Sequence, residues 1–141
     1  LTLSSGIAAF EAKHFAKAYD LLDSLAREGH PEALFRVAIM CQNGLGMAPN
    51  EGRALECMRA AAEQGHALAQ HGLGFMYLEG ECVDADGDAA VQWLTRAADQ
   101  GLQGSLATLA MMYSEGRGVP QDPEKAREFY ARAGFDPSEF M

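Results

Sequence analysis

A spacing of 36 residues recurs along the chain and constrains its fold more than any other feature. At this shift, small and large apolar residues fall into columns without an insertion between Ala18 and Phe129. A fixed period of this length is typical of repeat proteins, in which each unit buries its apolar face against its neighbours. The columns include Gly44, Gly80 and Gly116; Gly29, Gly65 and Gly101; Ala18, Ala54, Ala90 and Ala126; and Leu22, Met58, Leu94 and Tyr130.

Each repeat is predicted to contain two helices. The first helices span 31–43, 67–79 and 102–115, because apolar residues recur there at helical spacing and a glycine follows each segment. The second helices begin at Asn50, Asp86 and Asp122, residue types whose side chains cap orphan backbone N–H groups. A shorter pair precedes them, with helices at 6–12 and 15–27.

The segment from Leu106 to Gly134, LATLAMMYSEGRGVPQDPEKAREFYARAG, resembles the Sel-one-like repeat, a relative of the tetratricopeptide repeat. Residues 71–101 match nearly as well, whereas residues 33–65 carry Cys41 and Cys57 in place of the usual aromatic residues. The resemblance covers about 31–134. It implies an all-α fold, a right-handed α/α superhelix or solenoid of antiparallel helix pairs that serves as a scaffold for other proteins, most often in bacteria.

The repeats predict a single solenoid domain over 1–141. It comprises an atypical tetratricopeptide-like first pair at 3–30, repeats at 31–66, 67–102 and 103–135, and a C-terminal tail at 136–141. The C-terminal segment 134–141, GFDPSEFM, contains Phe135 and Phe140, so end-to-end self-association is one structural alternative.

Composition excludes several classes of partner. Twenty acidic residues against eleven basic ones give a net charge of −9, which disfavours binding to nucleic acid or to an anionic membrane. No apolar run reaches the length of a membrane span, so membrane insertion is not expected. Three irregularly spaced cysteines favour a reducing compartment such as the bacterial cytoplasm. Because the chain begins at Leu1 rather than Met, an upstream signal and a periplasmic location stay open.

The acidic segment 78–90 has part of the pattern of a calcium loop. Asp84, Asp86 and Asp88 stand at the first, third and fifth positions of such a loop. The sixth and twelfth positions hold Ala89 and Thr95 instead of Gly and Glu, and Asp86 aligns with the helix caps. We therefore predict a helix start, with calcium binding as the alternative.

No catalytic residue, metal site or cofactor is predicted. The four histidines lack zinc-ligand spacing, and no cysteine stands beside a base in the repeat register. Some cysteine-rich relatives are linked to β-lactams, which makes a β-lactam-recognising hydrolase the alternative function. The regular cysteine pairing of those relatives is missing here.

The first helix of each repeat is expected to line a concave groove that binds a peptide or helix of another protein. If tetratricopeptide packing applies, apolar residues point into this groove and polar ones form its rim. An alternative is that superhelical curvature partly buries them. The predicted partner-binding residues are Phe35, Ile39, Gln42, Asn43, His71, Phe75, Leu78, Glu79, Met111, Ser114 and Glu115.

Overall fold

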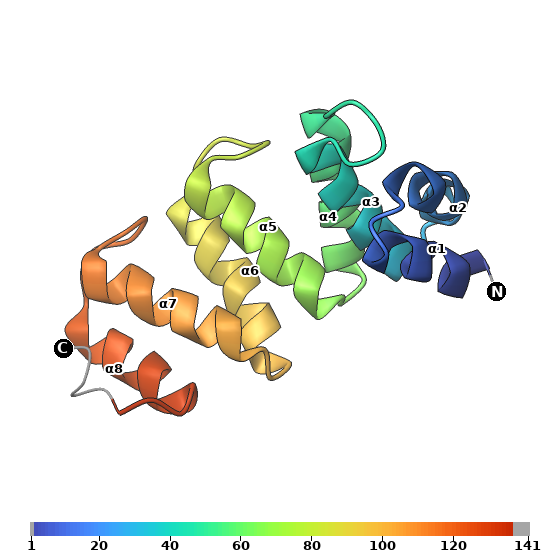
Figure 1. Ribbon diagram of the computed structural model, residues 1–141. Helices are drawn as coiled ribbons and strands as arrows, with labels where there is room; N and C mark the ends of the chain where they lie inside the picture. Colours follow the sequence, from blue (N-terminus) through green and yellow to red (C-terminus); the bar gives the residue numbers. More distant parts are fainter. Residues whose placement is uncertain (1, 137–141) are drawn as a thin grey trace. The chain divides into compact units, whose positions relative to one another are not determined.

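The chain is helical throughout the part that the computed structural model describes, residues 2–136 (Figure 1). Eight α-helices follow one another over these residues, with turns between them and no strand. The predicted all-α repeat fold is confirmed. The helices are α1 (Thr2–Glu11), α2 (Phe15–Arg27), α3 (Pro31–Asn43), α4 (Glu51–Glu63), α5 (Ala67–Glu79), α6 (Gly87–Asp99), α7 (Gln103–Glu115) and α8 (Pro123–Arg132).

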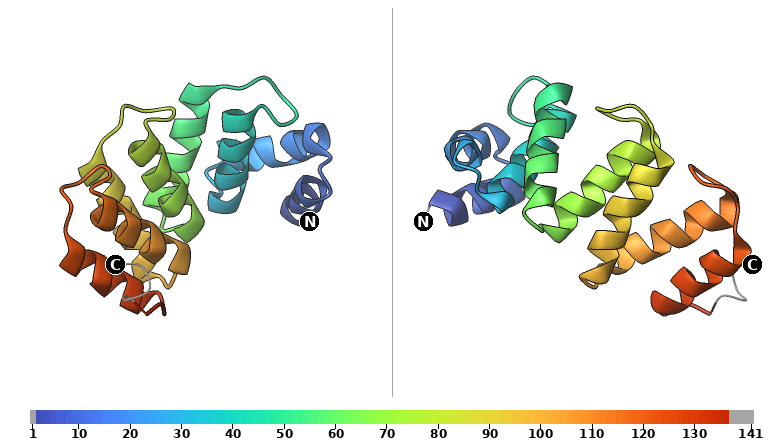
Figure 2. Two further views of the ribbon diagram at one scale, coloured as in Figure 1. Left: turned by 60° about the vertical axis from the view of Figure 1, so that its left-hand side comes forward. Right: turned by 180° about the vertical axis from the view of Figure 1, so that it is seen from behind.

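The helices belong to two compact units, Leu1–Ala69 and Gln70–Met141. Unit 1 contains α1 to α4 and the first residues of α5, and unit 2 contains the rest of α5 together with α6 to α8. Within each unit, consecutive helices form antiparallel pairs, which can be followed in both views of Figure 2. The two units are described separately below.

The core of unit 1 consists of small and medium apolar side chains from α1 to α4. Leu22, Val37 and Met40 are fully buried, and alanines at the helix crossings let the backbones approach. Gly6 has the same role where α1 crosses α2, because a Cβ atom placed on it would lie 2.5 Å from Leu22 Cδ2. The repeat columns that align small residues therefore mark close helix contacts.

Unit 2 has its own hydrophobic cluster, built from α5, α6 and α7. Its centre is made of Leu94, Leu109 and Met112, which are fully buried. Phe75, Tyr77, Val91, Met111, Val119 and Phe129 are partly buried and pack around it. Gly74 lets α5 approach α6, since a Cβ atom there would lie 2.7 Å from Leu94 Cγ.

The predicted helix ends are confirmed in detail. Asn50, Asp86 and Asp122 each accept a hydrogen bond from the backbone N–H three residues later, at 3.1 Å in all three caps. The acidic segment thus contains a helix start, as its repeat register predicts. Three expected bounds shift: α7 begins at Gln103 after Leu102 as its N-cap, and α1 spans Thr2–Glu11 instead of 6–12.

Cys82 has a left-handed backbone conformation, and glycine occupies the equivalent position in the neighbouring repeats. Its φ is 63°, and the residues one repeat before and after it, Gly46 and Gly118, have φ values of 77° and 78°. A side chain in the left-handed region costs roughly 1–2 kcal/mol, whereas glycine adopts it without strain.

Replacing Cys82 with glycine is expected to stabilise unit 2 by about 0.5 kcal/mol, because relief of this strain exceeds the extra freedom of the unfolded chain. Urea unfolding followed by the fluorescence of Trp93, the single tryptophan of the chain, measures the change. Cys82→Ser is the control, since it keeps the Cβ atom and should leave the midpoint unchanged. An equal effect of both substitutions would show that the thiol, not the backbone, sets the stability.

Candidate functional site

In unit 2, predicted binding residues of α5 lie next to α7. The ring of His71 is hydrogen-bonded to Ser105, with 2.7 Å between Nδ1 and Oγ, and its centroid lies 4.8 Å from that of Phe75. Burial lowers the pKa of His71, so the imidazole is neutral at pH 7. The histidine is therefore fixed between the two helices and supports the Phe75 ring.

Phe75 and Met111 are the apolar members of this surface, and both are half-buried against the cluster of unit 2. Ser114 is half-buried, while Glu79 and Glu115 are exposed. Glu79 forms an ion pair with Arg117, which follows α7. We call His71, Phe75, Glu79, Met111, Ser114 and Glu115 the α5–α7 face.

Leu78 is the exception among the predicted residues of unit 2. Its side chain is only 9% exposed and belongs to the hydrophobic cluster. The physical reason is the turn after α7: Leu78 Cδ1 lies 3.2 Å from the position that a Cβ atom on Gly118 would take. Leu78 thus holds this turn and offers little surface to a partner.

The predicted residues of unit 1 all lie on α3. Phe35 stacks on His66 with 4.8 Å between ring centroids, and His66 Nε2 lies 3.0 Å from a Glu32 carboxylate oxygen. Ile39 is half-buried, and its carbonyl accepts a hydrogen bond of 2.9 Å from the exposed Asn43 side chain. Gln42 is half-buried. These side chains present a mixed polar and apolar face on α3.

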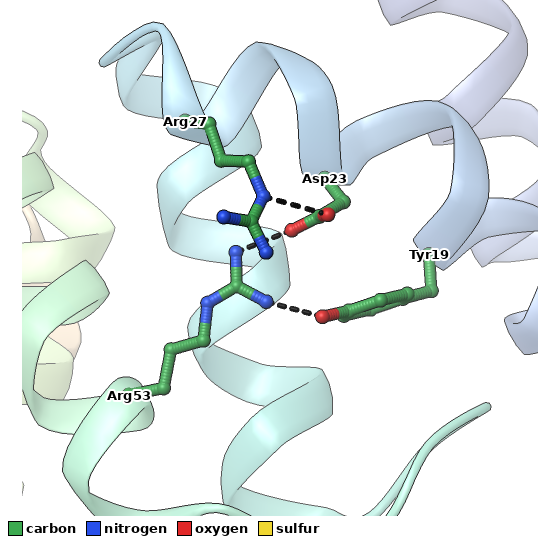
Figure 3. A network of polar contacts seen from close by, with 4 residues as sticks. All are labelled: Tyr19, Asp23, Arg27 and Arg53. Carbon is green, nitrogen blue, oxygen red and sulfur yellow. Dashed lines mark hydrogen bonds and ion pairs between the residues drawn. The ribbon is translucent and has the colours of Figure 1, made fainter.

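A polar network in unit 1 was not predicted from the sequence. Arg53 of α4 donates hydrogen bonds to the Tyr19 hydroxyl and to Asp23, both on α2, and Arg27 Nε donates to the other Asp23 oxygen at 3.0 Å (Figure 3). Burial acts to raise the pKa of Asp23, but the hydrogen bonds and charges of Arg53 and Arg27 outweigh it and hold that pKa below its ordinary value. Three side chains of α2 and one of α4 are thereby held together.

Beside this network, unit 1 has a cleft of about 630 Å³ between α2 and α4. Leu34 of α3 also lines it, and the other lining residues come from the end of α2 and the first three turns of α4. The two cysteines in place of aromatic residues are the one feature of the sequence that points to this cleft. Its lining consists of Ala26, Arg27, Leu34, Asn50, Gly52, Arg53, Glu56, Cys57 and Ala60.

The described residues offer little scope for metal binding or nucleophilic chemistry. Across residues 2–136, no three His, Cys, Asp or Glu side chains stand close enough together to hold a metal ion. Cys41 and Cys57 are buried thiols, and burial raises the pKa of both, which disfavours the nucleophilic thiolate. None of the helices in the same range has the length and apolarity to cross a membrane.

Comparison with known protein families matches the Sel1 repeat at residues 31–66, 67–102 and 105–134. The chain belongs to the Sel1 repeat family. The resemblance seen in the sequence is confirmed, and Sel1 repeats generally mediate protein–protein interactions on a fold that is typically a non-catalytic scaffold. None of the curated protein sequences compared with the chain matches it significantly.

Two solved structures show the same Sel1-like repeat fold, and both come from bacteria. One is c5321, a protective antigen present in uropathogenic Escherichia coli strains displaying an SLR fold, with 31% identity, a TM-score of 0.86 and coverage of 94% of this chain. The other is a Sel1 repeat protein from Oxalobacter formigenes, with 26% identity, a TM-score of 0.75 and coverage of 83%. This chain spans 29% and 34% of the lengths of those two proteins.

The alternative of end-to-end self-association depends on Phe135 and Phe140. Phe135 is 46% exposed and lies edge-on to Tyr130, with 6.4 Å between ring centroids. Phe140 and the end of the tail fall outside the described residues, so self-association through the tail stays a prediction.

Proposed function

We propose that this Sel1 repeat chain is a non-catalytic scaffold that binds a peptide or helix of another protein on the faces of its first helices. The observation that carries the proposal is the pair of Phe75 and Met111 on the α5–α7 face, which stay partly exposed beside the carboxylates of Glu79 and Glu115. Apolar side chains that remain accessible on a folded surface are typical of protein contacts. The carboxylates and the net charge of −9 favour a partner helix with apolar residues on one side and basic residues at its edges.

The α3 face of unit 1, with Phe35, Ile39, Gln42 and Asn43, is proposed as a second contact surface of the same kind. Its aromatic ring is already stacked on His66, so it is held in place before a partner binds. Preorganised contact residues lose less side-chain freedom on binding than mobile ones. Binding on this face is accordingly expected to depend on Phe35.

Replacing Phe75 with glutamate is expected to reduce partner binding at least about tenfold, because a charge would enter the apolar centre of the α5–α7 face. The measurement is affinity capture from a bacterial lysate with the tagged chain, followed by titration of each captured protein against the purified variants. Helicity by circular dichroism is recorded for every variant.

Val91→Glu is the matched control. Val91 is also half-buried against the cluster of unit 2, but it lies on α6, outside the α5–α7 face. The two substitutions add the same charge to the same core, so a general loss of folding would affect both. Partners that bind Phe75→Glu as tightly as the unchanged chain would exclude this face as the binding site.

A further inference from the structure

The two units correspond at a shift of 72 residues, twice the repeat length, and the cleft of unit 1 is filled at the same place in unit 2. There, Phe129 stacks on Tyr113 with 5.9 Å between ring centroids and 6° between ring planes. Arg132 lies over the Phe129 ring, with its guanidinium carbon 5.6 Å from the ring centroid, and it forms an ion pair of 3.4 Å with Asp99. In unit 2, therefore, Arg132 covers the Phe129 ring, and the Asp99 carboxylate holds Arg132 in place.

Unit 1 differs at all four of these positions. Cys41 replaces Tyr113, Cys57 replaces Phe129, Ala60 replaces Arg132, and Arg27 replaces Asp99. Both rings and the covering side chain are therefore missing. Because Ala26 and Leu34 keep the apolar character of their counterparts Ala98 and Leu106, the floor stays apolar while the space above it opens. Three of the four replacements, Arg27, Cys57 and Ala60, line the cleft of about 630 Å³, whereas Cys41 is fully buried and does not line it.

The rim of the cleft carries a positive charge, Arg27, at the position where unit 2 has Asp99. The Arg27 side chain is 69% exposed, and within residues 2–136 its one polar partner is Asp23, which takes the Nε donor. Its two amino groups thus remain able to donate to a bound carboxylate. Arg53 and Glu56 also line the cleft, so its charged lining has two arginines and one glutamate in a chain of net charge −9.

We propose that this cleft binds an aromatic side chain of a partner protein that has a carboxylate beside it. The ring would lie on Cys57, Leu34 and Ala26, in the place that Phe129 fills in unit 2, and the carboxylate would pair with Arg27. Such a ligand supplies a ring and a carboxylate, two of the groups that unit 2 contains and unit 1 lacks. The volume falls within the range of roughly 300–1,000 Å³ that ligand sites occupy, and a buried aromatic anchor with a charge at the rim is a common form of recognition.

This site is separate from the α5–α7 face and from the α3 face, which are formed by other side chains. It therefore stands or fails independently of the proposed function. Substitutions on those two faces are expected to leave the binding of an aromatic peptide in the cleft unchanged.

Three hexapeptide probes test the proposal by titration into the full chain labelled with ¹⁵N. The first has the sequence Gly-Ser-Asp-Phe-Glu-Gly, the second carries Ala in place of Phe, and the third carries Lys in place of both acids. We expect saturable shifts of amide signals at the end of α2 and the start of α4 with the first probe. The other two are expected to bind at least about tenfold more weakly, because each lacks one of the two recognised groups.

A variant that copies unit 2 provides the decisive comparison. The triple substitution Arg27→Asp, Cys57→Phe and Ala60→Arg introduces the ring, the covering arginine and its carboxylate. This variant is expected to fold, because the same side chains pack together in unit 2, and to lose binding of the first probe. Arg27→Glu alone is expected to weaken the first probe at least about tenfold and to strengthen binding of the lysine probe.

Two results would overturn the proposal. One is unchanged binding of the first probe by the triple variant with its helicity preserved. The other is the absence of saturable shifts at α2 and α4 with the first probe at millimolar concentration, or shifts that map to another face.

Discussion

Gly87→Ala is expected to destabilise unit 2 by about 2–3 kcal/mol, although alanine is normally the better helix former. Gly87 is the first residue of α6, and a Cβ atom built on it would lie 1.5 Å from the Gly118 carbonyl oxygen and 2.5 Å from the Gly118 carbonyl carbon. The obstacle is backbone, so a change of side-chain rotamer cannot relieve it. The turn after α7 must move away from α6, and with it the contact that Gly118 makes with Leu78.

Trp93 fluorescence during urea unfolding measures this loss, since the tryptophan lies on α6. Gly52→Ala is the matched control at the start of α4, where the nearest atom to a new Cβ is the Asn50 side-chain oxygen at 3.7 Å. With open space, the same substitution is expected to be neutral or to stabilise by about 0.5 kcal/mol. An unchanged midpoint for Gly87→Ala would mean that the turn after α7 does not rest on α6 in solution.

The Gly87 contact illustrates what the repeat pattern could not predict. Glu51 and Pro123 occupy the same column, so the column itself shows no requirement for a small residue. The requirement comes from the turn of the following repeat, which is a contact between residues 31 positions apart. The equivalent contact in unit 1 places Gly46 against the backbone of Phe15, where a Cβ atom on Gly46 would lie 2.4 Å from the Phe15 carbonyl carbon.

Features that every repeat shares were predictable, because the same physical requirement is repeated in the sequence. The caps at Asn50, Asp86 and Asp122 and the bounds of α3 and α5 follow from such columns. Features that occur in a single repeat could not be predicted in this way, because no other repeat contains the same pattern. The Tyr19, Asp23 and Arg53 network is of this kind, as is the inward position of Leu78, whose column also holds Gln42 and Ser114.

The candidate surfaces were predictable only in part for the same reason. Helical spacing identifies Phe75 and Met111 as neighbours on one side of α5 and α7, and both remain half-buried. The support of the Phe75 ring by His71, which is hydrogen-bonded to Ser105, depends on two side chains from different repeats. The cleft between α2 and α4 depends on which large side chains are missing. The sequence shows cysteines in the aromatic columns at Cys41 and Cys57, but it does not show whether other side chains fill the space.

Removing Arg53 is expected to destabilise unit 1 by about 2 kcal/mol, because Asp23 and Tyr19 would lose their charged hydrogen-bond partner. The Arg53 and Asp23 side chains are 20% and 21% exposed, so water compensates for only part of the loss. Arg53→Met keeps most of the aliphatic stem and isolates the charge. Arg27→Met is the control: it also removes a bond to Asp23, but from an exposed position, and should cost less than about 1 kcal/mol.

The same network predicts how stability changes with pH. Because the folded-state pKa of Asp23 lies below its ordinary value, its ionised form stabilises the folded state above the unfolded-state pKa of about 3.9. This contribution is lost as the pH falls from about 4 through the folded-state pKa. Urea unfolding followed by circular dichroism at pH 7 and at successive steps below pH 4 should show a smaller acid-induced loss for Asp23→Asn than for the unchanged chain. Parallel curves for the two proteins would mean that Asp23 does not stabilise the fold through its charge, and the large effect expected for Arg53→Met would then need another cause.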